Sequence, residues 1–403
     1  MEAYLDNWLT TRMAPEVMEA MRPFMEGSYG VPSGLYGLSM EADRAVERAR
    51  EAIARPMNAD PTGIHFTSGA TEANNLAIVG ALRANRKRGR HVITTAVEHP
   101  SVLETCEQLA REGEAEVDFL KVDGEGFIGL DQLACLVRED TVLVSILYVN
   151  NIVGTIQPME KIGDALASAK QRPLLHVDGV GAYGLMPLDA EKLGVDLLSI
   201  SSHKIHGPKG VGALWVRKGT RLAPLMRGVN SMSNLRPGDE NVPGIVGFGR
   251  AAELAGEGMD RNLASARKLW ERFVARLGRD VQEAKLNGPR GDRRSPYNIN
   301  FSFSSIEGEA VTLELDSRGI SVSTGSACAS KRLKSNHVMV AMGKPPEEAH
   351  GSLRLTLSRN TTAEELDYTV AALADVFERL RKISAYRPGM EDKTCDRCMA
   401  VKK

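Results

Sequence analysis

The chain has 403 residues, with 51 basic and 52 acidic side chains and a formal net charge of −1. At about 100 to 200 residues per domain this length predicts two or three domains and excludes a small disulfide-stapled scaffold, while the balanced charge predicts no general binding of nucleic acid or of an anionic membrane. Apolar residues make up 42%, but no run approaches the ~18 needed for a membrane span and no secretory signal is evident, so we expect a folded cytoplasmic protein.

Short apolar runs alternate with helical stretches in the first 216 residues. The strands that we predict are Ile64–Phe66, His91–Thr95, Val117–Val122, Thr141–Val149, Leu174–Asp178, Leu197–Ser201 and Val211–Val216. The helices that we predict are Glu72–Arg88, Ser101–Glu112, Leu130–Arg138 and Met159–Ala169. This alternation favours an α/β domain with a mostly parallel seven-stranded sheet covered by helices on both faces.

The pattern changes after about Gly256. A long amphipathic helix, Asp260–Leu277, is followed by a loop, a strand at Asn298–Phe303 and a last helix at Ala363–Lys382. We therefore predict a large α/β domain over residues 14–256 and a smaller α+β domain formed by residues 1–13 and 257–386. Residues 387–403 are predicted to be a flexible tail, and they contain Cys-x-x-Cys at Cys395 and Cys398.

Three segments of the predicted large domain suit the chemistry of a phosphorylated cofactor. The segment 66–75 is a strand, a turn of small residues and the start of a helix, whose free N–H groups would attract a phosphate. Asp178 ends an apolar strand, where a carboxylate could keep a ring nitrogen protonated, and Lys204 follows the next strand as a candidate Schiff-base amine. Each feature alone also suits an ordinary turn, a helix cap or a surface lysine.

Several motifs together resemble cysteine desulfurases of the NifS/IscS type. They are Ser68–Asn75 (SGATEANN), Glu98–His99 (EH), His176–Asp178 (HVD), Ser201–Lys204 (SSHK), Ser323–Cys328 (STGSAC) and Glu348–Arg354 (EAHGSLR). The likeness extends from about Tyr4 to Arg381. These enzymes are class V aminotransferases of fold type I and use pyridoxal phosphate, so the resemblance implies that fold and that cofactor.

The resemblance also implies a role for each matching residue. Lys204 would form the Schiff base and move protons, Asp178 would pair with the pyridinium nitrogen, and His99 would stack on the ring and act as an acid or base. The phosphate would be held by Ala70, Thr71, Ser201 and His203. Asn151 would lie near the ring hydroxyl, and Arg354 would bind the substrate carboxylate.

Cys328 is the residue to which the resemblance assigns sulfur transfer. It would attack the sulfur of bound L-cysteine, leaving L-alanine and a persulfide that passes to a scaffold or carrier protein, for Fe–S cluster or other sulfur-cofactor assembly. Cys106 and Cys135 are expected to be buried structural thiols. Cys395 and Cys398 could relay sulfur, bind metal with a partner's ligands, or be incidental. The resemblance further implies a homodimer.

The sequence departs from the family pattern around the substrate. Trp8 and Leu9 replace small residues, and Gly30–Tyr36 (GVPSGLY), with Val31 and Tyr36, lacks an expected amide and histidine. Gly181 stands where a glutamine is usual. Asp239 replaces a threonine that would reach the partner subunit's phosphate.

Three hypotheses follow from this combination. The leading hypothesis is a cysteine desulfurase, because a simple aminotransferase or β-lyase has no use for Cys328. The second is a related lyase that cleaves a C–S, C–Se or other Cβ bond of a modified amino acid in the altered pocket. The third is a non-catalytic sulfur-relay or assembly protein, which Gly181 and Asp239 suggest.

Overall fold

The computed structural model describes residues 1–229, 232–303, 306–324 and 336–383. A seven-stranded sheet has the order β2-β8-β7-β6-β5-β3-β4 and is parallel except for β8, which is antiparallel to both of its neighbours. Its strands are β2 (Ile64–Thr67), β3 (His91–Thr95), β4 (Glu116–Leu120), β5 (Thr141–Leu147), β6 (Leu174–Asp178), β7 (Leu197–Ser201) and β8 (Gly212–Val216). The predicted seven-stranded, mostly parallel sheet is confirmed.

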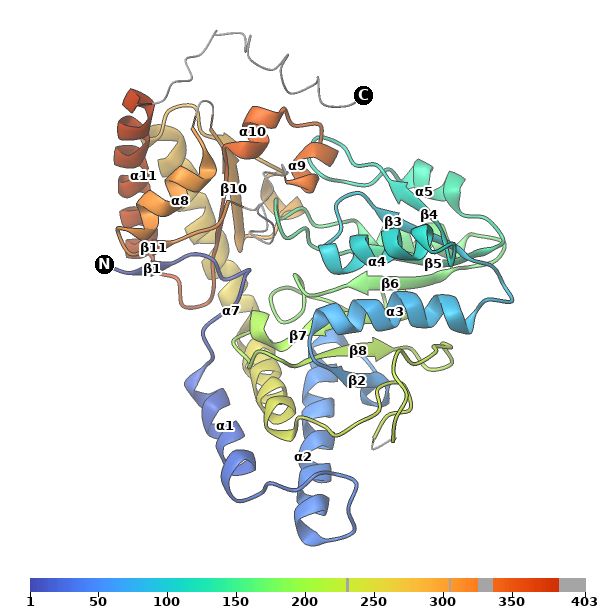
Figure 1. Cartoon of the computed structure of the whole chain (residues 1–403). Coiled ribbons are helices and arrows are strands. Elements are labelled where there is room, and N and C mark those ends of the chain that lie inside the picture. Colours follow the sequence, from blue (N-terminus) through green and yellow to red (C-terminus); the bar gives the residue numbers. More distant parts are fainter. Residues whose placement is uncertain (230–231, 304–305, 325–335, 384–403) are drawn as a thin grey trace.

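Helices cover both faces of this sheet. On one face lie α3 (Ala70–Ala84) and α4 (Pro100–Arg111), and α3 crosses the sheet in Figure 1. Adjacent residues of one strand, such as Leu143 and Val144 in β5, belong to different apolar clusters. Because successive side chains of a strand point to opposite faces, this split explains why the strands are apolar throughout their length.

The C-terminal part contains a three-stranded antiparallel sheet of order β12-β10-β9. Its strands are β9 (Lys285–Leu286), β10 (Asn298–Ser302) and β12 (Ser352–Thr356), and the helices packed near it are α8 (Gly308–Asp316) and α11 (Ala363–Ile383). The remaining helices are α1 (Pro15–Glu26), α2 (Gly37–Ala54), α5 (Leu130–Leu136), α6 (Met159–Ala167), α9 (His337–Ala341) and α10 (Pro346–His350).

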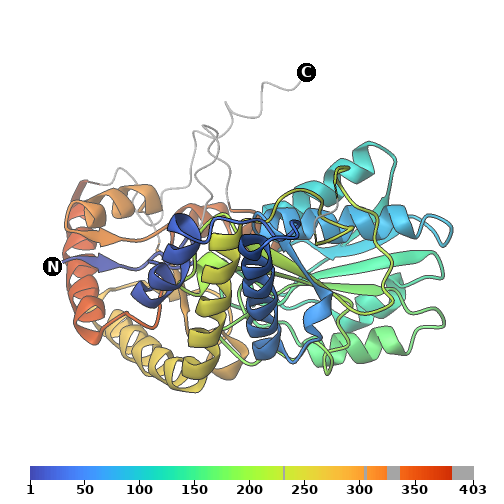
Figure 2. The same ribbon diagram turned by 90° about the horizontal axis from the view of Figure 1, so that it is seen from below.

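The helix α7 (Val242–Asp280) runs between the two parts. It has 39 residues and contacts α1, α2 and α11, as Figures 1 and 2 show. The sequence pattern predicted only Asp260–Leu277, because the first half of α7 is rich in glycine and alanine and lacks a clear polar face. The predicted domain boundary at residues 256 and 257 falls inside α7, and the division into domains stays a prediction.

Residues 3–11 connect the C-terminal sheets with the large sheet. The strand β1 (Ala3–Tyr4) pairs with β11 (Ile320–Ser321), Asp6 bridges to Thr356, and the Thr11 N–H donates to the His203 carbonyl at 3.0 Å. Residues 3–11 therefore contact both the C-terminal sheets and the segment that follows β7 of the large sheet. In the part of the chain that the structure describes, no helix has the length and apolar character of a membrane span.

Candidate active site

A cavity of about 1350 Å³ lies at the carboxyl ends of the central strands. Leu147, Asp178 and Ser201, the last residues of β5, β6 and β7, line it. Ligands of open α/β sheets bind at this edge. The structure brings together here every described residue that the sequence analysis assigned to the site: Ala70, Thr71, His99, Asn151, Asp178, Ser201, His203, Lys204 and Arg354.

Lys204 is half-buried at the end of a short 3₁₀ turn, Ser202–Lys204, that follows β7. It donates hydrogen bonds to the main-chain carbonyls of Trp8 and of Leu9, the latter at 3.0 Å. Burial, together with the positive charge of Arg354, lowers the pKa of Lys204 to about 8, against the opposing effect of Asp6 and Asp178. The neutral, nucleophilic form of the amine is therefore reached at a much lower pH than for an ordinary lysine, and it predominates above about pH 8.

Asp178 and His99 are joined by a chain of hydrogen bonds. The Asn74 amide donates to Asp178 Oδ2 at 2.9 Å and to Ser101 Oγ at 2.8 Å, and Ser101 Oγ lies 2.8 Å from His99 Nδ1. Asp178 Oδ1 also accepts the Val180 N–H at 3.1 Å. The Asp178 carboxylate, which is 2% exposed, is thus held from both sides with its plane fixed.

The first turn of α3 lines the same cavity. Ala70 and Thr71 begin this helix, and Ser201, His203 and Lys209 are also among the lining residues. Burial, with the nearby Lys204 and Lys209, lowers the pKa of His203 to about 4, so this imidazole is neutral at pH 7. Free helix N–H groups beside a lysine suit a phosphate group.

Asp239 does not line this cavity. It lies on a separate cavity of about 90 Å³ together with Arg50, His65 and Arg236. Arg236 itself reaches Glu72 in the first turn of α3, with Nε 3.1 Å from Oε1. Within one chain Asp239 therefore does not line the large cavity, and its position relative to a partner subunit's phosphate stays a prediction.

Arg354 lies on β12 at the opposite end of the cavity. Its Nη2 pairs with Asp6 Oδ1 at 2.8 Å, and its Nη1 donates to the Asn151 carbonyl at 3.2 Å. Its Nε and the Asn151 side-chain Oδ1 are buried and have no hydrogen-bond partner among the residues that the structure describes. Because buried polar atoms are nearly always paired, these two mark places where a bound ligand would complete the structure.

Trp8 and Gly181 occupy one space. A Cβ on Gly181 would lie 2.7 Å from Trp8 Cζ2 and 3.0 Å from the Val149 Cβ, which is too close for any side chain. The two departures from the family pattern are therefore a single change, in which the indole fills the room that a side chain at position 181 would take. Trp8 and Leu9 line the cavity as expected, whereas Val31 and Tyr36 are not among its lining residues.

We expect Gly181→Ala to destabilise the protein by about 1–3 kcal/mol, because the added methyl overpacks against Trp8. In a Trp8→Ala background the same change should cost at least about 1 kcal/mol less, since the contact is gone. Denaturant unfolding of the four proteins in this double-mutant cycle measures the coupling. Gly124→Ala is a matched control, because a Cβ there meets nothing within 4 Å. Equal costs in both backgrounds would contradict the pairing.

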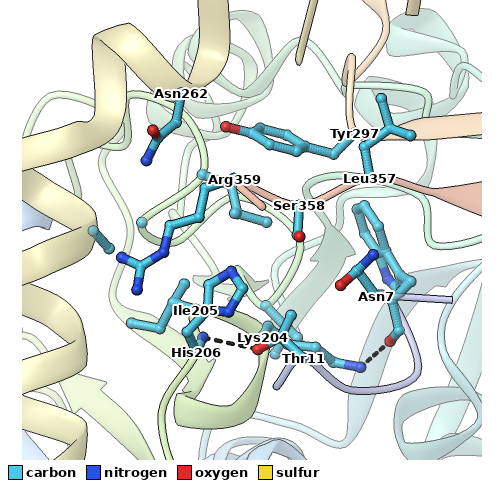
Figure 3. Close-up of a pocket in the computed structure, with 15 residues that line it drawn as sticks. Asn7, Thr11, Lys204, Ile205, His206, Asn262, Tyr297, Leu357, Ser358 and Arg359 are labelled. Carbon is cyan, nitrogen blue, oxygen red and sulfur yellow. Dashed lines mark hydrogen bonds between the residues drawn. The ribbon is translucent and has the colours of Figure 1, made fainter. Parts of the chain in front are cut away.

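A third cavity, of about 30 Å³, lies beside Lys204. Figure 3 shows Lys204, Thr11 and His206 together on one side of it, with Asn262 and Tyr297 on the other. The His206 N–H donates to Thr11 Oγ1 at 2.8 Å. Trp8 and Lys204 line both this cavity and the large cavity, so these two side chains stand between the two.

The cysteines divide into three groups. Cys106 is buried, and burial raises the pKa of its thiol to about 12, as expected of a structural residue. Cys135 is exposed, so the prediction that it is buried was wrong; it lies near the end of a seven-residue helix with a single buried position, Leu133. Cys328, Cys395 and Cys398 lie outside the described residues.

Three side chains that hold the site were missed by sequence reasoning. They are Asp6, which pairs with Arg354, and Asn74 and Ser101, which connect Asp178 with His99. Asn74 lies inside the motif SGATEANN and Ser101 lies two residues after His99, but neither position by itself indicates a long-range partner. The signal that was available for Ser101 is its place in the first turn of a helix that begins at Pro100, directly after His99.

Comparison with known proteins agrees with this geometry. A cysteine desulfurase IscS from Dictyoglomus turgidum is 46% identical over 387 residues, covering 96% of this chain and 97% of the relative. The solved structure of a NifS-like protein matches with a TM-score of 0.88 and 38% identity over 94% of this chain and all of the other, and that of SspA in complex with cysteine matches with a TM-score of 0.77 and 31% identity over 89% and 100%. Residues 3–369 match the aminotransferase class-V family, and the chain belongs to that family.

Proposed function

We propose that this protein is a cysteine desulfurase that converts L-cysteine to L-alanine and takes the sulfur onto Cys328. The observation that carries the proposal is the gathering of Lys204, Asp178, His99 and Arg354 around one cavity, with the pKa of the Lys204 amine lowered to about 8. The relatives named cysteine desulfurase IscS support the choice of substrate.

The cofactor of this family is pyridoxal phosphate, and the cavity fits it. The phosphate would lie at the first turn of α3 against Ser201 and His203, the ring nitrogen against Asp178, and the ring hydroxyl against the unpartnered Asn151 Oδ1. When bound, this cofactor supplies an electron sink for the bonds at the substrate Cα. Asn74 and the Val180 N–H hold the Asp178 carboxylate in place for that contact.

Arg354 would orient the substrate through its carboxylate. Asp6 binds Nη2 of the guanidinium and the Asn151 carbonyl accepts from Nη1. The buried Nε would then donate its hydrogen bond to the substrate carboxylate. Lys204 would bind the cofactor covalently and then carry protons to and from the substrate carbon. Its amine needs to move only from the carbonyls of Trp8 and Leu9 into the cavity that it already lines.

Sulfur transfer itself needs one thiolate. The Cys328 thiol attacks the substrate sulfur, the Cβ–S bond breaks, and the Cβ receives a proton, so that L-cysteine and one thiol give L-alanine and one persulfide. No further oxidant or reductant enters this balance. Residues on either side of Cys328 in the sequence, Thr324 and Asn336, line the cavity. The persulfide would then pass its sulfur to a scaffold or carrier protein that builds Fe–S clusters or another sulfur cofactor.

The test is turnover of L-cysteine by the purified, cofactor-loaded protein. We expect alanine and sulfide in equal amounts when a thiol reductant is present, together with a change of the visible absorbance on addition of L-cysteine. Faster turnover of L-selenocysteine or of another β-substituted amino acid, with L-cysteine inert, would instead support the lyase hypothesis. The absence of a cofactor band would support the non-catalytic hypothesis and contradict the proposal.

A homodimer is the assembly that we propose, and the surface of α1, α2 and their connection supports it. Large apolar side chains are exposed there: Met18, Met25, Tyr29, Leu35, Tyr36 and Met40. Leu35 is 99% exposed, which is unfavourable for leucine in water. Sedimentation equilibrium measures the mass in solution, and a monomer at micromolar concentration would contradict this proposal.

A further inference from the structure

His99 caps the N-terminus of α4 with its own side chain. The Ser101 backbone N–H donates to His99 Nδ1 at 3.2 Å, and Ser101 Oγ lies 2.8 Å from the same nitrogen. A backbone N–H can only donate, so Nδ1 must present its lone pair. A proton on Nδ1 would face that N–H directly and break the cap.

The direction of the Ser101 hydroxyl is fixed from the other side. An ionised carboxylate only accepts hydrogen bonds, so Asn74 must turn its NH₂ group toward Asp178, at 2.9 Å. The second hydrogen of this NH₂ group then points to Ser101 Oγ at 2.8 Å, which leaves the hydroxyl hydrogen free to point to His99 Nδ1. Two donors therefore converge on Nδ1.

We propose that Asn74 and Ser101 hold His99 as a neutral imidazole with its proton on Nε2, so that His99 donates a hydrogen bond in the cavity and transfers no proton. This inference deepens the proposed function, on which its meaning for catalysis rests. It removes the acid–base role that the family resemblance suggested for His99. The protons at the substrate carbon are then left to Lys204.

The surroundings of His99 agree with a neutral ring. Burial lowers the pKa of His99, and Lys204 and His337 act in the same direction, while Asp178 and Glu104 oppose them. His337 lies beside this segment, with its Nε2 2.9 Å from the carbonyl of Glu98, the residue that precedes His99. A neutral histidine that donates from a helix N-terminus polarises a substrate without changing its own charge.

The protonation state can be observed without turnover. The chain has eight histidines. In protein labelled with ¹⁵N-histidine, the signals of His99 are identified as the ones that are missing from the spectrum of His99→Asn. We expect one ring nitrogen to be bare and the other to carry a proton, with no titration near the ordinary pKa of histidine, in cofactor-free and in loaded protein. A proton on Nδ1, or a ring that titrates near its ordinary pKa, would overturn the proposal. Neither result depends on which substrate the enzyme uses.

Ser101→Ala tests the positioning role. This variant keeps the backbone donor to Nδ1 but removes the hydroxyl, so we expect the pKa of His99 to rise and a second tautomer to become detectable. Unchanged histidine signals in Ser101→Ala would contradict the part assigned to Asn74 and Ser101.

Two substitutions of His99 separate its two nitrogens. Asn places an acceptor where Nδ1 lies and keeps the helix cap, whereas Gln places an NH₂ donor near Nε2 and loses the cap. We expect His99→Gln to retain more of kcat than His99→Asn, with the pH profile of the parent enzyme, and to melt about 1–3 °C lower than His99→Asn. Loss of one limb of the pH profile in His99→Gln, with kcat down about 10²-fold or more, would show proton transfer by His99 and overturn the proposal.

Discussion

Replacing Lys204 with alanine should reduce the formation of alanine from L-cysteine by about 10³-fold or more and remove the visible band of the bound cofactor. Of the two described lysines that line the large cavity, only Lys204 feels the charges of both Asp178 and Arg354 and has a lowered pKa, whereas Lys209 is exposed, so we expect no efficient replacement nucleophile. Alanine release and the absorbance spectrum of the dialysed protein measure the two effects.

Lys218→Ala is a suitable control, because Lys218 is exposed on the turn that follows β8. It should keep both the turnover and the spectrum of the parent protein. If Lys204→Ala retained the absorbance band and a large part of its turnover, another lysine would carry the chemistry and the assignment would be wrong.

The lowered pKa of Lys204 also predicts a pH dependence. Its pKa in the folded protein is about 8, below the ordinary 10.5, so the neutral amine is scarce below pH 8 and predominates above it. The rate at which cofactor-free protein takes up pyridoxal phosphate should therefore rise as the pH passes through about 8, since only the neutral amine adds to an aldehyde.

Replacing Cys328 with alanine should stop sulfur transfer while leaving the cofactor bound. We expect sulfide release and alanine formation to fall by about 10³-fold or more, because the thiolate that accepts the sulfur is gone, whereas Lys204 and Asp178 are intact. Mass spectrometry of the parent protein after L-cysteine should find one additional sulfur on the peptide that contains Cys328.

Cys135→Ala is the matched control for this prediction, since Cys135 is an exposed thiol that does not line the large cavity. Its turnover should equal that of the parent protein. Full desulfuration by Cys328→Ala would exclude persulfide chemistry at this residue. The hypothesis that Cys395 and Cys398 relay sulfur has its own test. If it is right, sulfur transfer to an acceptor protein is slower in the double variant Cys395→Ser and Cys398→Ser than in the parent protein.

The fold was largely predictable because its central strands carry an unambiguous signal. Leu174–Asp178 and Leu197–Ser201 are apolar on both faces and end at small or polar residues, and both strands have the predicted bounds. The strand β12, which presents Arg354, was not predicted: five residues between a glycine and a loop are too few for periodicity to separate strand from coil.

The site was predictable to the extent that its residues lie in local motifs. Lys204, Asp178 and His99 each follow or precede a recognisable element. The contacts that orient them join residues far apart in the sequence, as in Asp6 with Arg354 and Asn74 with Asp178, and nothing in a local pattern specifies such pairs. The Trp8–Gly181 pair shows the same limit, because each change taken alone predicts a damaged pocket and only the packing shows that the two changes compensate.

The segment formed by residues 3–11 has a consequence for synthesis of the protein. Asn7 donates to the Thr356 carbonyl at 2.8 Å, and the Trp8 N–H donates to Thr356 Oγ1 at 2.9 Å, so residues made first are fixed by residues made among the last. The carbonyls of Trp8 and Leu9 cannot be anchored in this way for Lys204 until β12 has left the ribosome. Emerging chains therefore pass most of their translation with this wall of the cavity unfinished, and stable uptake of the cofactor becomes a post-translational event.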